Sequence, residues 1–348
     1  MNNNELKMLQ SLPLDVKIAK TKLRINEAID YFGADHLYVP VSGGKDSTVL
    51  SFLVEEVQKE RGIPKKAIPR VNSNTGNEYD DVLENARSLS DLEVRPKHNL
   101  IWVLTNDGYP IGCKKVSRML RDLQNPTETN YNSRKLYLEV IKKDGSKSKS
   151  FKLPKKYYPF INSCIRCSEK CCYYLKKEPM HTYERDNKRH PILGTMAAEG
   201  GTRKSGYLQT GCNAFKTGNG KSIPRGFWTE NDILMTIKLF SIQIPKSYGY
   251  IVDVNTGETP TYKDVKKAID NGILLNLTTT GEKRTGCVWC LLGIGTEKGE
   301  NRFQRLKKID PKKYKFAIEG GTFDDKGKLI PKGGLGIGKI LDMMNIKY

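Results

Sequence analysis

Apolar residues recur at helical spacing near the start of the chain, between Pro13 and Gly33. Proline is favoured in the first turn of a helix and glycine just past its end, so this pattern predicts an amphipathic helix. The apolar run at 36–41 then predicts a short buried strand that leads into a glycine-rich turn. Beyond the turn, a second apolar periodicity predicts a helix that ends near Gly62.

The alternation of strand-like and helix-like patterns continues along the chain. Further predicted strands lie at 68–72, 100–104 and 192–195. Further predicted helices lie at 80–89, 116–123 and 227–239. Thr229 and Asp232 resemble a capping box at the start of the last helix. Strands and helices in alternation indicate an α/β protein with a Rossmann-like, doubly wound parallel sheet covered on both faces.

The predicted domain organisation follows from breaks in this pattern. We expect an N-terminal helix at 1–34, an α/β domain at 35–245 and a Cys-rich C-terminal subdomain at 246–348. A polar, Lys-rich stretch near 125–160 is interpreted as an insertion in the α/β domain, with a hairpin around Asp144-Gly145. The segment after 279 is predicted to be rich in loops.

The charge balance points to a polyanionic partner. The 348 residues include 59 Lys and Arg against 39 Asp and Glu, a net charge of +20. A surplus of this size favours nucleic acid, although solubility alone is the simpler reading. No apolar run approaches the roughly 18 residues of a membrane span, and the first residues lack a secretory pattern, so we expect a cytoplasmic protein without a membrane partner. An oligomer is compatible with this composition.

The glycine-rich turn at 42–47 reads Ser-Gly-Gly-Lys-Asp-Ser. The common nucleotide loop, G-x-x-x-x-G-K-[ST], would require Gly at position 39 and Ser or Thr at position 46, where this chain has Val39 and Asp46. The dinucleotide pattern G-x-G-x-x-G also fails. A different and tighter phosphate-binding turn therefore has to be considered.

The residue types in the turn suit a phosphate ligand. Gly43 and Gly44 allow backbone N–H groups to approach phosphate oxygens without a Cβ in the way. The hydroxyls of Ser42 and Ser47 can donate hydrogen bonds, and Lys45 supplies a positive charge. The helix that follows adds its positive end. These features together predict a cradle for phosphate groups.

This six-residue segment after a strand resembles the signature of the PP-loop ATP pyrophosphatases. The resemblance implies an adenine nucleotide alpha hydrolase-like fold that binds ATP and Mg²⁺, in which a substrate oxygen attacks the α-phosphorus and pyrophosphate leaves. It assigns nucleotide binding to Ser42–Ser47 and catalytic roles to Ser42, Lys45, Asp46 and Ser47. Asp46 is the expected Mg²⁺ ligand.

Three further segments resemble the phosphoadenosine phosphosulfate (PAPS) reductase family within this superfamily. They are 72–79, similar to D-T-G-x-x-F-P-E-T, 193–200, similar to G-x-R-A-x-E-S, and 227–233, similar to W-T-x-x-D-[IV]. The resemblance adds further nucleotide-binding residues, namely Asn74, Thr75, Gly76, Gly194 and Thr195. Asn74 stands where the family has Asp and Met196 where it has Arg, and Arg203 offers a replacement cation.

Eight cysteines indicate metal or redox chemistry in a reducing compartment. They lie at positions 113, 164, 167, 171, 172, 212, 287 and 290. Cys113 stands apart and is expected to be a buried thiol. The pairs Cys164-x-x-Cys167 and Cys287-x-x-Cys290 form a zinc arrangement, Cys212 is a further candidate ligand, and free thiols remain a third reading.

The segment 171–179 resembles the C-C-x-x-x-K-x-x-P segment of the iron–sulfur members of the family, and Cys287-x-x-Cys290 resembles their distant G-C-x-x-C. The resemblance implies a [4Fe–4S] cluster held by Cys171, Cys172, Cys287 and Cys290, with zinc as the alternative. The pair at 287 and 290 takes part in both metal readings.

The PAPS and adenylyl-sulfate reductases carry a nucleophilic cysteine in a C-terminal E-C-G-[IL]-H motif, and no cysteine follows Cys290 here. We therefore expect adenylation of a target for sulfur incorporation. The chain looks similar to the ATP pyrophosphatase subunits of DNA phosphorothioation systems and to PAPS reductase-family proteins of phages and mobile elements. This implies nucleic acid as partner, DNA before tRNA, and a sulfur donor such as a cysteine desulfurase. The alternatives are a reductase-like oxidoreductase and a non-catalytic subunit that binds ATP and DNA.

Overall fold

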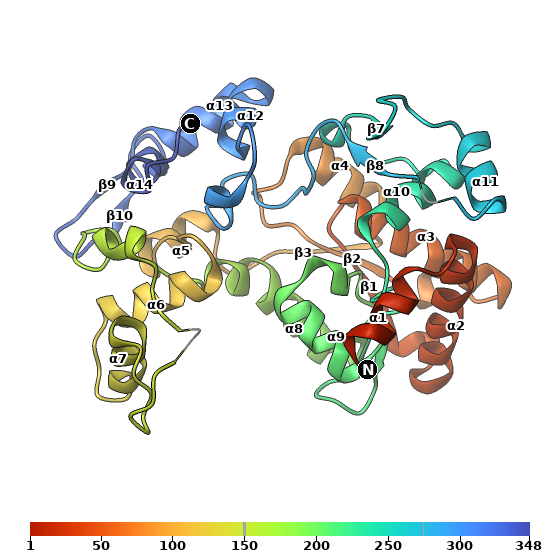
Figure 1. The fold of residues 1–348 in the computed structure, drawn as a ribbon, viewed down its shortest axis with the longest axis horizontal. Coiled ribbons are helices and arrows are strands. Elements are labelled where there is room, and N and C mark those ends of the chain that lie inside the picture. The colour runs from red at the N-terminus through yellow and green to blue at the C-terminus, as the bar shows by residue number, and fades with distance from the viewer. Residues whose placement is uncertain (149–150, 274) are drawn as a thin grey trace. The chain divides into compact units, whose positions relative to one another are not determined.

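The computed structural model describes residues 1–148, 151–273 and 275–348, which form two compact units (Figure 1). Unit 1 comprises Met1–Asn74, Glu78–Arg95 and Pro179–Gly286. Unit 2 comprises Thr75–Asn77, Pro96–Glu178 and Cys287–Tyr348. Each unit is assembled from three separate stretches of the chain. The predicted domains are consecutive segments with boundaries at 34/35 and 245/246, and they stay a prediction.

Unit 1 is built around a parallel four-stranded sheet in the order β3-β2-β1-β4. The strands are β1 (Leu37–Val41), β2 (Arg70–Ser73), β3 (Leu92–Val94) and β4 (His190–Pro191). In the sheet register, Val39 pairs with Arg70 and Leu37 with His190. Helices alternate with these strands, so the predicted Rossmann-like, doubly wound α/β class is confirmed.

The helices of unit 1 are α1 (Asn3–Gln10), α2 (Leu14–Phe32), α3 (Lys45–Glu60), α4 (Asp80–Leu89), α8 (Glu178–Asn187), α9 (Gly201–Thr210), α10 (Glu230–Leu239) and α11 (Tyr262–Asp270). Two small antiparallel pairs join β5 (Asn213–Ala214) with β6 (Lys221–Ser222) and β7 (Ile251–Asp253) with β8 (Leu277–Thr279). Short 3-10 turns lie at Ala34–His36, Lys65–Ala67, Ala197–Glu199 and Lys246–Tyr248. The predicted helices at 14–32 and 80–89 are confirmed, as is the capping box, in which Thr229 N–H donates to Asp232 Oδ2 at 2.7 Å.

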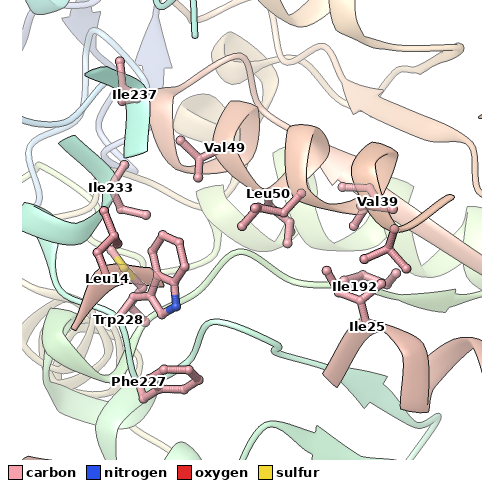
Figure 2. Packing of buried hydrophobic residues seen from close by; sticks show 14 of the residues in the cluster. Leu14, Ile25, Val39, Val49, Leu50, Ile192, Phe227, Trp228, Ile233 and Ile237 are labelled. Atoms are coloured by element: carbon pink, nitrogen blue, oxygen red, sulfur yellow. The ribbon is translucent and has the colours of Figure 1, made fainter. Parts of the chain in front are cut away.

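The core of unit 1 lies between the sheet and helices α2, α3 and α10, as Figure 2 shows. The labelled side chains are Leu14, Ile25, Val39, Val49, Leu50, Ile192, Phe227, Trp228, Ile233 and Ile237. Fully burying one such side chain contributes about 1.5–3 kcal/mol. Trp228 has no exposed surface, and its indole N–H donates to Thr21 Oγ1 at 2.9 Å. The buried Lys17–Asp232 ion pair, 2.8 Å long, ties α2 to α10.

Unit 2 is mainly helical. Its helices are α5 (Leu100–Asn106), α6 (Lys114–Gln124), α7 (Tyr131–Glu139), α12 (Arg302–Ile309), α13 (Pro311–Ile318) and α14 (Ile337–Met343). β9 (Thr322–Phe323) and β10 (Leu329–Ile330) form an antiparallel pair, and 3-10 turns lie at Lys155–Phe160 and Ile294–Thr296. A π-helix covers Tyr173–Lys177, directly after the tandem cysteines. The predicted helix at 116–123 is confirmed as part of α6.

The predicted strand at 100–104 is wrong, because these residues form α5. Asn99 caps this helix by accepting a hydrogen bond from Trp102 N–H at 2.9 Å. The third strand is instead β3, an edge strand in which Leu92 is 48% exposed. A short apolar run fits a strand or a buried helix equally well, and an exposed edge strand has no apolar run to reveal it.

Three other local predictions also need correction. Residues 131–139 form α7 rather than the first strand of a hairpin, although an isolated antiparallel bridge joins Ile141 and Lys147 around the predicted turn. The return strand includes 149–150, which lie outside the described residues. The segment after 279 contains α12, α13 and α14. The predicted strand at 192–195 is wrong in position, because β4 covers only His190–Pro191 and Ile192 forms no more than an isolated bridge to Ser222. None of the helices that the structure describes has the length and apolar character needed to cross a membrane.

Candidate nucleotide site and cysteine pocket

The loop at 42–47 lies at the carboxyl end of β1 and includes the first turn of α3. β1 has β2 on one side and β4 on the other, so the chain order along the sheet reverses beside it. Open α/β sheets bind ligands at such a switch point, outside the carboxyl ends of their strands. The fold thus puts the predicted phosphate loop at the position where a nucleotide is expected.

The first turn of α3 is open to an anion. Gly44 is its N-cap and has no side chain that could cap the turn, although the Lys45 N–H donates to the Tyr248 hydroxyl. The Ser47 hydroxyl donates to the Gly44 carbonyl at 2.9 Å and accepts from the Ser42 N–H at 3.2 Å, which holds the loop in shape. A helix N-terminus carries unpaired N–H groups and about half a positive charge. This geometry is suited to a phosphate group.

The glycines of the loop are required for packing. Gly43 has a φ of +75°, and a Cβ at this position would lie 2.0 Å from the Val82 carbonyl oxygen in α4. Asn85, also in α4, donates to the Gly43 carbonyl at 2.8 Å. A Cβ at Gly44 would lie 3.0 Å from the Tyr248 hydroxyl. Close approach of α4 and Tyr248, which the motif does not reveal, therefore explains both glycines in this structure.

Lys45 is fully buried and already paired. Its ammonium lies 2.9 Å from Glu230 Oε1, donates to the Lys283 carbonyl at 2.7 Å, and sits over the Tyr248 ring at 4.7 Å from the centroid. Its backbone N–H donates to the Tyr248 hydroxyl at 3.1 Å. The predicted phosphate-binding lysine thus has a carboxylate and a carbonyl as partners in this structure.

Arg225 is a cation of the site that sequence reasoning missed. It has no exposed surface, and its Nη2 donates to the Asp46 carbonyl at 2.5 Å and the Gly194 carbonyl at 2.9 Å. Its Nε and Nη1 have no hydrogen-bond partner among the described residues, and Nη1 lies 3.9 Å from Asp46 Oδ1. Burial lowers the pKa of Arg225 to about 10, which leaves it charged at neutral pH. A buried guanidinium with unused donors is matched to an anionic ligand.

Two more arginines add positive charge near Asp46. Glu199 pairs with Arg203 and, at 3.3 Å, with Arg284. Burial and the neighbouring Arg284 lower the pKa of Arg203, and the charge of Asp46 opposes that shift. The cation expected from Arg203 is therefore part of the same electrostatic environment as the loop.

The remaining predicted nucleotide residues are divided between the units. Gly194 and Thr195 follow β4 in unit 1, where Gly194 contacts Arg225. Asn74 also belongs to unit 1, and its N–H donates to the Val94 carbonyl at 3.0 Å. Thr75 and Gly76 belong to unit 2. The structure therefore brings Gly194 to the loop through Arg225 and assigns Thr75 and Gly76 to the unit that contains the cysteine pocket.

Unit 2 contains a pocket with an empty volume of about 470 Å³, including space open to solvent. The four predicted metal ligands, Cys171, Cys172, Cys287 and Cys290, all line it. The other lining residues are Thr75, Leu100, Leu104, Tyr109, Pro110, Leu175, Lys176, Trp289, Leu291 and Ile337. The walls between the thiols are therefore mostly apolar.

The thiols in this pocket interact with one another and with nearby ammonium groups. A hydrogen bond from Cys171 lowers the pKa of Cys172, and the charges of Lys114 and Lys176 act in the same direction. The same hydrogen bond, together with burial, raises the pKa of Cys171, and burial raises that of Cys290. Ammonium groups beside a thiolate are typical of reactive or metal-binding cysteines.

The donor set fits an iron–sulfur cluster. In the part of the chain that the structure describes, no group of three or more His, Cys, Asp or Glu side chains is arranged to hold a metal ion. A structural zinc site needs four ligands about 2.0–2.3 Å from one ion, whereas the cysteines of a [4Fe–4S] cluster each bind a different iron atom. The four thiols that line one apolar pocket are donors of the type that an iron–sulfur cluster takes.

The other cysteines lie outside this pocket. Cys164 is exposed, and Cys167 is buried with its N–H donating to Gln124 Oε1 at 2.9 Å. Cys212 belongs to unit 1, where its sulfur lies 3.4 Å from the Tyr207 hydroxyl. The expectation that Cys113 is a buried thiol is wrong, because it is exposed at the N-cap of α6. Of the two cysteine pairs in the zinc alternative, Cys287 and Cys290 line the pocket, and Cys164 and Cys167 do not.

Sequence reasoning missed Arg225 and Tyr248. Arg225 lies two residues before the buried Phe227-Trp228 pair, and a charged residue next to such a strongly apolar segment requires partners inside the fold. That signal was present in the sequence, whereas nothing in the sequence indicated the contact of Tyr248 with the loop. No family model matches this chain, and no curated protein matches it.

Proposed function

We propose that this protein is an ATP pyrophosphatase of the PP-loop type, related to the PAPS reductase family, that adenylates a nucleic-acid target for sulfur incorporation. The observation that carries the proposal is the Ser-Gly-Gly-Lys-Asp-Ser loop at the sheet's switch point, with the buried, partly unpaired Arg225 beside Asp46. The resemblance to DNA phosphorothioation subunits supports a nucleic-acid target, and so does the net charge of +20.

The reaction balances with the residues at the loop. A target oxygen attacks the α-phosphorus of ATP, the bond to the bridging oxygen breaks, and its electron pair leaves with pyrophosphate. Backbone N–H groups of the first turn of α3, together with Lys45 and Arg225, stabilise the charge that builds up on the leaving group. Mg²⁺, when bound, neutralises phosphate charge, and the 38%-exposed carboxylate of Asp46 is the group that fits it. The terminal sulfur of a persulfide, supplied by a donor such as a cysteine desulfurase, then displaces AMP, and two electrons from a thiol reductant cleave the resulting disulfide and release the donor.

The cysteine pocket belongs to the same proposal. Cys171, Cys172, Cys287 and Cys290 hold a [4Fe–4S] cluster, which supplies electron transfer or a site for labile sulfur. The apolar side chains of the pocket exclude water from it, and Lys176 offsets thiolate charge.

The test measures pyrophosphate released from ATP and Mg²⁺ by the full chain, purified without oxygen, with and without DNA and tRNA. We expect release that nucleic acid stimulates, and a loss of about 100-fold or more in Lys45→Ala. Lys59→Ala is the matched control, because Lys59 is in the same helix and its side chain is 66% exposed. Unchanged release in Lys45→Ala would contradict the assignment of the loop.

A second candidate is a subunit that binds ATP and nucleic acid without turnover. The specific observation in its favour is Lys45, whose ammonium is already bound by Glu230 and the Lys283 carbonyl. In that case the loop would bind ATP without releasing pyrophosphate under any of the conditions above. Calorimetry measures ATP binding on the same samples. Binding with pyrophosphate release supports the enzyme, and binding without release supports the second candidate.

A further inference from the structure

The positive charge of the chain is concentrated in unit 2. This unit contains 31 Lys and Arg against 14 Asp and Glu, a net charge of +17, whereas unit 1 contains 28 against 25, a net charge of +3. If the net positive charge were distributed evenly along the chain, unit 1, which is larger, would carry more of it than unit 2. The polyanion-binding surface indicated by composition is therefore expected on unit 2.

Unit 2 also presents a cluster of aromatic rings at its surface, the aromatic platform, which consists of His98, Trp102, Tyr173 and Tyr174. The His98 and Trp102 rings stack with centroids 3.6 Å apart and planes 11° from parallel. Tyr174 packs edge-on against Trp102 at 5.7 Å and against Tyr173 at 5.5 Å. Trp102 is 38% exposed and Tyr173 is 49% exposed. The cluster thus offers ring surface to solvent in a fixed arrangement.

Exposed lysines adjoin the platform residues along the chain. Lys97, next to His98, and Lys177, at the end of the π-helix, are both exposed. Lys170 forms a 2.7 Å ion pair with Asp107, and Glu178 follows Lys177. Exposed aromatic rings interspersed with Lys are the features by which proteins bind single-stranded nucleic acid, since bases stack on the rings and phosphates pair with the cations.

The elements that carry the platform also form walls of the cysteine pocket. In α5 (Figure 1), Leu100 and Leu104 line the pocket, and Trp102, two residues from each, lies on the opposite face of the helix. In the π-helix, Leu175 lines the pocket while its neighbour Tyr174 contacts Trp102. π-helices are rare and occur frequently at functional sites. The platform is therefore held by the elements that shape the pocket.

We propose that unit 2 is the nucleic-acid-binding unit and that an unpaired nucleobase stacks on the aromatic platform at Trp102. That the bound nucleic acid is also the target of adenylation rests on the proposed function. Binding of nucleic acid to unit 2 does not depend on it. Trp102 is 38% exposed, whereas Trp228, the core tryptophan of unit 1, has no exposed surface.

The experiment measures fluorescence anisotropy of a labelled 20-nucleotide oligomer with the full chain, as single-stranded DNA, single-stranded RNA and duplex DNA of the same sequence. We expect single strands to bind more tightly than duplex. Trp102→Leu should raise the Kd for single strands about 5- to 100-fold, the range for losing one base–aromatic stack. Trp102→Phe, which keeps a stacking ring, should restore most of the affinity.

Tyr250→Leu is the matched control, because Tyr250 is 74% exposed and belongs to unit 1. Unchanged affinity in Trp102→Leu would overturn the proposal, and so would displacement of the oligomer by polyglutamate as readily as by unlabelled oligomer. Should Trp102→Leu fail to fold, Tyr173→Leu and Tyr173→Phe give the same comparison at a more exposed ring. ATP binding should be equal in all these variants. If the unmodified chain does not bind ATP at all, the proposed function is refuted, whereas the proposal for the platform is not affected.

Discussion

At the scale of single residues, the buried Lys45 of unit 1 is paired with a carboxylate that is partly exposed. Lys45 has no exposed surface, whereas its partner Glu230 is 46% exposed. Desolvating the lysine is unfavourable unless a negative group stays beside it, and the more exposed carboxylate can leave for water at a lower cost. Phosphate oxygens at the start of α3 would take its place. If the loop binds ATP as proposed, Glu230 competes with the nucleotide for Lys45.

Glu230→Gln should strengthen ATP binding because it removes this competitor. We expect a decrease in Kd of about fivefold, on the order of 1 kcal/mol for a half-exposed ion pair, and a correspondingly larger rise in Tm on adding ATP. The measurement is a thermal unfolding series with and without ATP and Mg²⁺. Glu60→Gln is the control, because Glu60 forms a surface pair with Lys22. Equal ATP-induced shifts in Glu230→Gln and the unmodified chain would show that Glu230 does not compete.

At the scale of elements, local sequence rules placed most helices correctly. Pro13 and Gly33 bound α2, and Thr229 with Asp232 caps α10, because caps act through hydrogen bonds over a few residues. The rules failed at α5, where five apolar residues carry too little pattern to distinguish strand from helix. They could not indicate the π-helix either, which places Cys172, Leu175 and Lys176 at one pocket.

The π-helix and its tandem cysteines lead to a prediction about metal content. The chain purified without oxygen should absorb light at about 400 nm and contain about four iron atoms per chain, as a [4Fe–4S] cluster requires. Cys172→Ser should lose most of this iron, because a cluster with one ligand replaced is less stable. Cys212→Ser is the control, since Cys212 lies in unit 1. A colourless protein that contains zinc would contradict the cluster and leave the nucleotide site unaffected.

At the scale of the whole molecule, the two units divide the charge unequally, with +17 on unit 2 and +3 on unit 1. Such a difference concentrates the long-range attraction for a polyanion on one unit. Salt screens this attraction over about 8–10 Å, so affinity for nucleic acid should depend strongly on ionic strength. Lysines on unit 2 should contribute to that dependence and lysines on unit 1 should not.

The double variant Lys97→Gln with Lys177→Gln should reduce the slope of log K against log salt by about 0.7 for each phosphate that no longer pairs with a lysine. The measurement is anisotropy of single-stranded DNA over a range of NaCl concentrations. Lys66→Gln with Lys263→Gln is the matched control, because both lysines are exposed and belong to unit 1. An equal decrease of the slope in the two double variants would mean that net charge, rather than its location, governs binding.

The sequence by itself determined the α/β class, most helices and the position of the 42–47 loop after a strand, because periodicity, capping and turn chemistry act over a few neighbouring residues. Only the tertiary structure decided which groups meet at that loop. Arg225 reaches Asp46 from 179 positions away, and Tyr248 reaches Lys45 from 203 positions away. It also decided which cysteines share a pocket and on which unit the charge collects, since both depend on contacts between segments far apart in the chain.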